Sequence, residues 1–302
     1  IQQQLLADRT ALVARGAHLC ESAGEGNHRA LVAAFMPEDF HDDFLRAHNL
    51  LEARARSTWR SGFLDAFAAE VDAARAESDV FIVSSEHFHS RLLQPVGVLR
   101  LADFLVPLFD SVDVVCYLRR QDEMALSFYS EKLRAGFVPP EILPLRNIRR
   151  LKGSLPPFFD FEALLARWAA AFGDHALRLR LYRRDSLTGG EVVRDFFEVA
   201  GLGEPVARLN AAANPSLCVA AQTALRLFNG MCDGNDVASR DRHRVTRLAL
   251  VDYLQAQPGG DRGFLPDVAE ARTFYAAFEA SNTRVANRWF GREALFDEDF
   301  SG

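Results

Sequence analysis

Two arginines follow a short apolar run near the middle of the chain, where the pattern changes from strand to helix. Most residues between Val112 and Leu118 are β-branched, aromatic or apolar, which predicts a strand covered on both faces of a parallel sheet. Arg119 and Arg120 come directly after this run, and a guanidinium group offers a rigid fork of donors that fits phosphate or carboxylate. Because ligands of open α/β sheets bind at the carboxyl ends of strands, these residues predict an anion site, with Ser127 on the following helix.

Three other side chains that could take part in catalysis or binding also stand at predicted strand ends. Glu86 and His87 follow the apolar run 79–85, and Tyr182 ends the run 176–182. A carboxylate that is partly desolvated in a pocket can serve as a general base. The alternatives remain open: a solvated turn for Glu86, a loop histidine for His87, and an aromatic ring packed under a helix for Tyr182. A metal site is not predicted, because it needs three or four ligands and no other cluster converges here.

The elements that position these residues alternate between helix and strand. Amphipathic spacing predicts one helix over 1–13 and two between 41 and 76, the second capped by Ser57 or Thr58. Strands are predicted at 79–85, 112–118 and 176–182, with helices between and after them and an irregular loop at 136–157. This order predicts an α/β fold, a mainly parallel sheet flanked by helices, with a helical C-terminal cap. We expect a single domain over 1–302, in which 1–215 form the core and 216–302 the cap.

Composition limits the classes of function. The chain has 302 residues, 49% of them hydrophobic and 25% charged, so it can bury a core without disulfides. Its four cysteines show no paired spacing and predict reduced structural thiols. A net charge of −6 argues against a broad nucleic-acid or anionic-membrane surface. No apolar run reaches the roughly 20 residues of a membrane span, so we expect a cytoplasmic protein. The sequence does not indicate an oligomeric state.

The segment LRRQDEMALSFYSEKLRAG resembles the 3′-phosphate-binding segment of sulfotransferases that use 3′-phosphoadenosine 5′-phosphosulfate (PAPS), most closely their bacterial, carbohydrate-sulfotransferase-like branch. The resemblance implies a P-loop-like fold in which Arg119 and Ser127 hold the nucleotide's 3′-phosphate. VFIVSSEHF resembles the strand that ends at the catalytic base, which implies this role for Glu86, with His87 as a second candidate. LRLRLYRRDSL resembles a later strand, whose tyrosine, here Tyr182, contacts the adenosine.

The resemblance extends over nearly the whole chain, and it implies PAPS as co-substrate, no metal, and a hydroxyl or amine of a carbohydrate or small metabolite as acceptor. One part of the pattern is absent: no lysine, threonine and glycine cluster that would cradle the phosphosulfate occurs in the 302 residues. We expect a further N-terminal segment to carry this loop and the central strand before it. The alternative is a non-catalytic nucleotide- or phosphate-binding protein of the same fold. A nucleotide kinase ranks last, because it needs the same missing lysine.

Overall fold

The computed structural model describes residues 1–150, 156–209, 217–232, 236–257 and 263–300. The chain forms two compact units. The first unit contains residues 1–118 and 161–209, and the second contains residues 119–160 and 210–302. Residues 119–160, which the sequence analysis placed in the core, therefore group with the C-terminal helices. The single domain over 1–302 stays a prediction.

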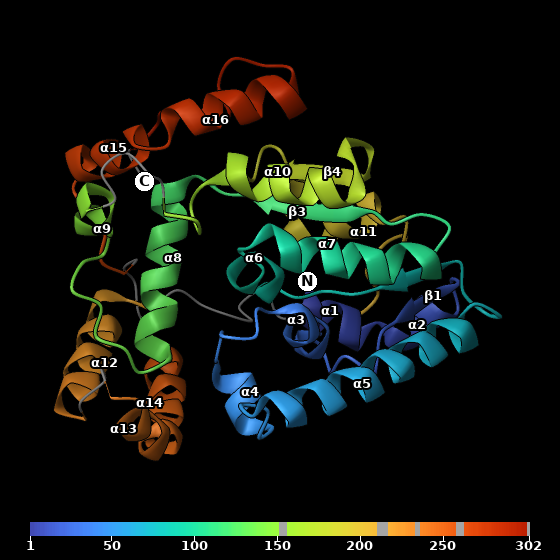
Figure 1. Ribbon diagram of the computed structural model, residues 1–302. Coiled ribbons are helices and arrows are strands. Elements are labelled where there is room, and N and C mark those ends of the chain that lie inside the picture. The colour runs from blue at the N-terminus through green and yellow to red at the C-terminus, as the bar shows by residue number, and fades with distance from the viewer. Residues whose placement is uncertain (151–155, 210–216, 233–235, 258–262, 301–302) are drawn as a thin grey trace. The chain divides into compact units, whose positions relative to one another are not determined.

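The first unit contains two pairs of parallel strands. Strand β1 (Ala17–Leu19) pairs with β2 (Val80–Ile82), and β3 (Val114–Leu118) pairs with β4 (Leu177–Leu181) (Figure 1). In each pair the strands are separated by helices in the sequence, as parallel pairing requires. The predicted α/β class is confirmed in this coarse form.

Helices cover both faces of β2. Its residues Val80 and Ile82 pack into a cluster with side chains of the N-terminal helices and of Phe196 and Phe197. Phe81, on the opposite face, contacts the ring of Phe67 at 5.5 Å between ring centroids. The helices of this unit are α1 (Gln2–Ala7), α2 (Arg9–Val13), α3 (Arg29–Phe35), α4 (Asp43–Ala47), α5 (Ala53–Ala74), α6 (His87–Arg91), α7 (Pro95–Leu105), α10 (Phe161–Phe172) and α11 (Val192–Val199).

The structure differs from the predicted elements at the start of the chain. The helix predicted over 1–13 is broken at Asp8, whose carboxylate accepts hydrogen bonds from the backbone N–H groups of Val206 and Ala207. Strand β1 was not predicted, because only three residues carry its pattern. The predicted caps Ser57 and Thr58 are wrong: α5 begins earlier, after Glu52, and both residues lie inside it.

The second unit is helical. Helix α8 (Gln121–Arg134) lies at its centre. Three helices pack against it: α12 (Val219–Met231), α14 (Arg244–Ala256) and α15 (Val268–Ala276). Tyr129 and Leu133 of α8 form a buried cluster with Leu225 and Val251. The remaining helices are α9 (Leu145–Arg150), α13 (Val237–Arg242), α16 (Glu279–Val285) and a π-helical turn at Ala286–Phe290. The predicted helical pattern after residue 216 is confirmed for the described residues.

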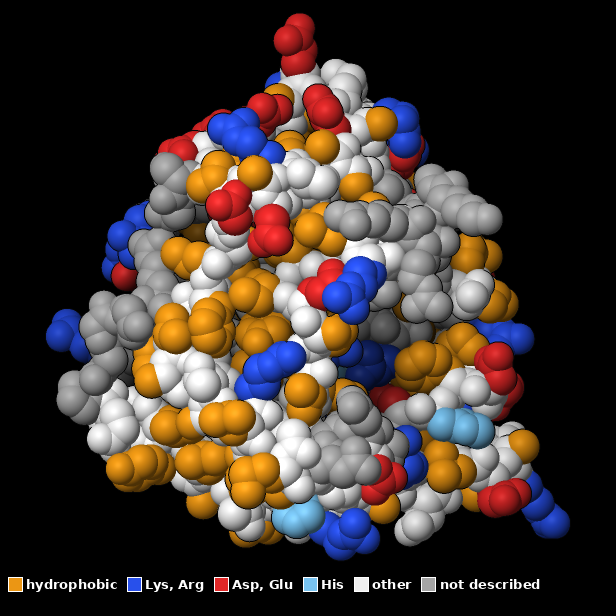
Figure 2. All heavy atoms as spheres, turned by 90° about the vertical axis from the view of Figure 1, so that its left-hand side faces the viewer, with side chains coloured by type: hydrophobic (Ala, Val, Ile, Leu, Met, Phe, Trp, Pro, Cys, Tyr) orange, Lys and Arg blue, Asp and Glu red, His pale blue; other side chains and the backbone are white. Residues whose placement is uncertain are grey.

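Hydrophobic side chains also reach the surface of the second unit. They gather over the lower part of the face in Figure 2, where α12 and α14 lie. The most exposed are Met231 at 88%, Val245 at 77% and Leu227 at 64%. No described helix has the length and apolar character needed to cross a membrane. All four cysteines are free thiols, as predicted.

Candidate functional site

The structure distributes the predicted site residues over both units. Glu86, His87 and Tyr182 belong to the first unit, whereas Arg119 and Ser127 belong to the second. Glu86 and His87 lie together, with His87 Nε2 at 3.5 Å from Glu86 Oε1. Arg119 immediately precedes the residue that caps α8, and Ser127 lies on that helix.

His28 joins the loops that follow β1 and β2. Its backbone N–H donates to the carbonyl of Ser84 at 3.0 Å, and the backbone N–H of Ser84 donates to Nδ1 of His28 at 2.8 Å. The His28 side chain is fully buried, and burial lowers its pKa to about 4. The imidazole is consequently neutral near pH 7, which is the state in which Nδ1 can accept this bond.

Glu70, on α5, holds the beginning of the loop after β1. Its carboxylate accepts hydrogen bonds from the backbone N–H groups of Glu21 and Ser22, at 2.6 and 2.8 Å, and lies 2.7 Å from His18 Nε2. Burial by itself would raise the pKa of Glu70, but the hydrogen bonds outweigh it and hold the pKa below its usual value. The carboxyl end of β1 is thus fixed by a charged group from a different element.

The carboxylate of Glu86 lies where the loop after β2 enters α6. Gln2 Nε2 donates to its Oε2 at 3.0 Å, and Asn27 Nδ2 donates to its Oε1 at 2.9 Å. The side chain is nevertheless 64% exposed. The exposure agrees with the solvated turn that was the alternative for Glu86 and not with a desolvated pocket, whereas the two amide donors give the carboxylate a defined orientation from which it can reach a substrate.

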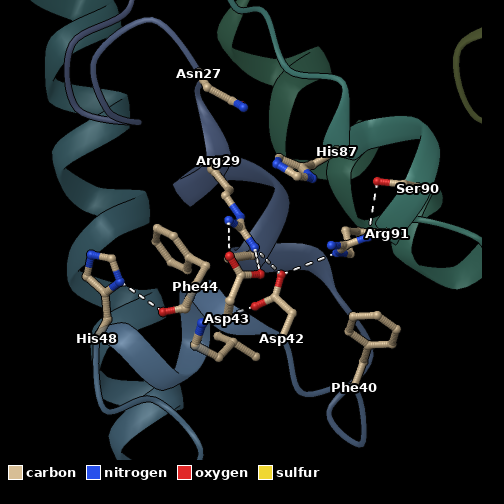
Figure 3. Close-up of polar contacts among 12 residues, drawn as sticks. Asn27, Arg29, Phe40, Asp42, Asp43, Phe44, His48, His87, Ser90 and Arg91 are labelled. Carbon is tan, nitrogen blue, oxygen red and sulfur yellow. Dashed lines mark hydrogen bonds and ion pairs between the residues drawn. The ribbon is translucent and has the colours of Figure 1, made fainter. Parts of the chain in front are cut away.

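Two arginines of the first unit converge on acidic residues of α4 and its cap (Figure 3). Arg29 donates to Asp42 and Asp43, each at 2.8 Å, and Arg91 Nε donates to Asp42 at 3.3 Å. The hydrogen bonds from Arg29 lower the pKa of Asp43 to about 2. Asp42 also caps α4 through the backbone N–H of Leu45. This cluster ties α3, α4 and α6 together.

His87 stands above these arginines in Figure 3. Burial lowers the pKa of His87; the Glu86 carboxylate opposes this effect, whereas the guanidinium groups of Arg29 and Arg91 add to it. His87 is thus held in its neutral form near pH 7, in which one ring nitrogen can accept a proton or a hydrogen bond.

The two arginines after β3 have different surroundings. Arg120 pairs with Asp122 at 2.7 Å, donates to the backbone carbonyls of Asp297 and Asp299, and lies over the ring of Phe300. Its side chain is 11% exposed, so Arg120 acts as a structural tie. Arg119 donates through Nε to Glu123 at 3.0 Å, and its side chain is 37% exposed.

Ser127 and Tyr182 both reach the surface. Ser127 is exposed on α8, beside Phe128, whose ring stacks on Phe158 with 4.9 Å between ring centroids. The backbone N–H of Tyr182 continues the β3–β4 ladder by donating to the carbonyl of Leu118, and its side chain is 39% exposed. The interpretation of Tyr182 as an aromatic ring packed under a helix and its interpretation as a binding residue both stay predictions.

Sequence reasoning missed the partners of these residues. Gln2 and Asn27 were not singled out, nor were Arg29 and Asp42. For Asn27 a signal existed: it follows Gly24 and Gly26, which have φ values of +112° and +70° and mark an irregular turn after a strand. Among the described residues, no three His, Cys, Asp or Glu side chains are grouped in a way that could hold a metal ion.

Comparison with known proteins finds a distant relative. A protein of the archaeon Archaeoglobus fulgidus, described only as uncharacterized, is 28% identical over 216 residues, which are 71% of this chain and 55% of that protein. The matched region thus spans about half the length of that relative. No family model and no solved structure matches the chain. These comparisons indicate no function, so a proposal for the function must be based on the residues of this chain.

Proposed function

We propose that this protein is a sulfotransferase that moves a sulfuryl group from PAPS to a hydroxyl or amine of a carbohydrate or small metabolite. The observation that carries the proposal is the segment from β3 to α8. Arg119 follows the carboxyl end of a parallel strand, and Ser127, eight positions later, is exposed on the next helix. A guanidinium group directly after the strand and a hydroxyl group on the following helix supply donors suited to a phosphate.

The arrangement of the strands supports a P-loop-like sheet. Val80 and Ile82 of β2 pack into the same buried cluster as Val115 and Tyr117 of β3, although no described backbone hydrogen bond joins the two strand pairs. One more parallel strand between β2 and β3 would satisfy the backbone groups along both inner edges. In the proposed fold this strand leads into the turn that cradles the phosphosulfate.

In the proposed reaction the acceptor oxygen or nitrogen forms a bond to the sulfur atom. The bond between sulfur and the bridging phosphate oxygen breaks, and its electron pair leaves with adenosine 3′,5′-bisphosphate. Glu86 takes the proton of the acceptor, because its carboxylate is oriented and exposed. Arg119 and Ser127 bind the 3′-phosphate, and Tyr182 contacts the adenosine. As in phosphoryl transfer, the protein mainly positions the reactants and stabilises charge.

The phosphate role of Arg119 can be tested by calorimetry with adenosine 3′,5′-bisphosphate and the protein expressed from its complete reading frame. Arg119→Ala removes a charge-assisted contact of about 1.5–3 kcal/mol, so we expect the affinity to fall by about 10- to 100-fold. Arg242→Ala removes the same charge from an exposed position of the second unit and serves as the matched control. Equal affinities for Arg119→Ala and the unaltered protein would contradict the assignment.

The transfer itself is tested with labelled PAPS and a panel of sugars and hydroxylated metabolites. We expect product with at least one acceptor, and we expect Glu86→Gln to abolish turnover while nucleotide binding is kept. Nucleotide binding without any transfer would instead support the non-catalytic alternative. Turnover that survives in Glu86→Gln would move the role of base to His87, 3.5 Å away.

A further inference from the structure

We propose that Asn27 and Gln2 are positioning residues that hold the Glu86 carboxylate in the orientation needed to take the acceptor's proton. This inference rests on the proposed function and extends it to two residues with no chemistry of their own. Each amide donates to a different oxygen of Glu86, at 2.9 Å from Asn27 and 3.0 Å from Gln2. Rotation of the carboxylate about its terminal bond would break both contacts.

The orientation of the Asn27 amide follows from its neighbours. The backbone N–H of His87 donates to Ser85 Oγ at 3.2 Å, so the hydroxyl proton of Ser85 is directed elsewhere. That proton meets Asn27 Oδ1 at an Oγ–Oδ1 distance of 2.6 Å. Because Oδ1 accepts this bond, the amide must present its NH₂ group to Glu86. Figure 3 shows the Asn27 side chain pointing toward the start of α6.

The Gln2 amide is oriented in a similar way. Its Nε2 lies 3.0 Å from Glu86 Oε2 and 3.5 Å from the carbonyl oxygen of Ser84. Both partners are acceptors, so the NH₂ group and not the amide oxygen faces them. The carboxylate is therefore held from α1 on one side and from the loop before α3 on the other.

The loop that carries Asn27 is itself anchored. The next residue, His28, is fully buried and exchanges two hydrogen bonds with Ser84, two positions before Glu86. Asn27 and Glu86 are thus mounted on two loops joined by a buried contact. A carboxylate on such a support is already held in its orientation before the substrate binds. A general base that is oriented in advance is more efficient, because little further ordering is needed for proton transfer.

Four variants and one control test this inference; the fourth variant, Asn27→Gln, restores an amide at position 27. Asn27→Ala and Gln2→Leu each remove one donor. Asn27→Asp keeps the shape and the Ser85 contact but turns a carboxylate oxygen toward Glu86. Gln3→Leu changes the neighbouring exposed glutamine of the same helix and is the matched control. Circular dichroism and thermal melts establish that each variant is folded, and the isosteric Asn27→Asp is informative even if Asn27→Ala does not fold.

We expect kcat to fall by about 10- to 100-fold in Asn27→Ala and Gln2→Leu, with the KM for PAPS and the affinity for adenosine 3′,5′-bisphosphate unchanged. In Asn27→Asp the acidic limb of the kcat–pH profile should also move to higher pH, because two adjacent carboxylates do not ionise independently. Asn27→Gln should recover part of the rate by restoring an amide. Gln3→Leu should behave as the unaltered protein.

The outcomes of these measurements distinguish failure of the positioning role from failure of the proposed function. Unchanged kcat in both donor-deletion variants of an active protein would overturn the positioning role and leave the proposed function intact. A fall in nucleotide affinity equal to the fall in kcat would also overturn it, because such a loss indicates a general structural defect. If the unaltered protein transfers sulfuryl to no acceptor, the proposed function fails and the role of Asn27 and Gln2 in it fails as well.

Discussion

The two units of this chain secure their interiors with different kinds of polar group. In the first unit, carboxylates tie separate elements together: each accepts hydrogen bonds from backbone N–H groups or arginines elsewhere in the unit. They are Asp8, Asp42, Glu70 and Asp195. In the second unit, neutral amides do the same, as in the buried pair of Gln121 and Asn282. The ion pair of Asp122 with Arg120 is an exception there.

This difference predicts different responses to acid. Burial alone would raise the pKa of each of the four carboxylates of the first unit, but their hydrogen bonds outweigh it, and each pKa lies below its usual value. A lowered folded-state pKa contributes stability that is present above the unfolded-state pKa and is lost as the pH falls toward the folded-state pKa. A neutral amide pair does not titrate. The first unit should therefore weaken first on acidification.

The largest effect is expected at Asp195. Its buried carboxylate binds Arg180, the hydroxyl of Tyr117 and the backbone N–H of Thr188, and so joins β3, β4 and α11. Asp195→Asn removes the charge and leaves these donors poorly matched, at a cost of about 3–5 kcal/mol, nearer the lower value because Arg180 is partly exposed. Urea denaturation measures the loss. Asp185→Asn, in an exposed turn of the same unit, is the control and should change little.

His28 should give the clearest pH dependence. Its folded-state pKa of about 4 lies below the usual 6.5, so its contribution is fully present above pH 6.5 and is lost between pH 6.5 and 4. The loss amounts to about 3 kcal/mol over that interval. His28→Asn keeps an acceptor for the N–H of Ser84 without titrating and should flatten this part of the stability curve. An equally steep curve for the variant would show that His28 is not responsible.

A smaller effect, independent of pH, is expected for the amide pair of the second unit. Gln121 and Asn282 exchange two hydrogen bonds at 2.7 and 3.0 Å and are almost fully buried. Gln121→Leu leaves Asn282 without this partner and should cost about 1–3 kcal/mol, whereas the double replacement with Asn282→Leu should recover much of the loss.

Hydrogen exchange, followed peptide by peptide at pH 7 and pH 5, would compare the acid sensitivity of the two units. Equal acid sensitivity would refute the distinction between them.

Much of the secondary structure could be predicted from local pattern. The boundary between β3 and α8 follows from the apolar run before Arg119 and the helical spacing after it, and both elements formed there. Pro107 ends α7 in a short 3₁₀ turn, as a ring without an N–H requires. Strand β1 was missed because three residues give too short a pattern, and its place is set by pairing with β2.

The candidate site was predictable only in part. Glu86 and Arg119 could be singled out because each stands at the end of a predicted strand and because the resemblance given in the sequence analysis implies a role for each. The hydrogen-bond partners of Glu86 could not be predicted, because its donors are Gln2 and Asn27, which lie 84 and 59 positions away in the sequence. Similarly, nothing in the pair Arg119–Arg120 indicates that the second residue is fixed by backbone carbonyls near the C-terminus.

The sequence by itself determined which segments form strands and helices and which charged residues stand at their ends, because apolar spacing and turn residues act locally. Only the tertiary structure decided which of those charges are structural ties and which stay open to a ligand. Arg120 and Asp195 are enclosed by groups from other elements, whereas Glu86 is oriented and still exposed. The physical reason is that burial and hydrogen-bond partners are properties of the folded neighbourhood, not of the residue type.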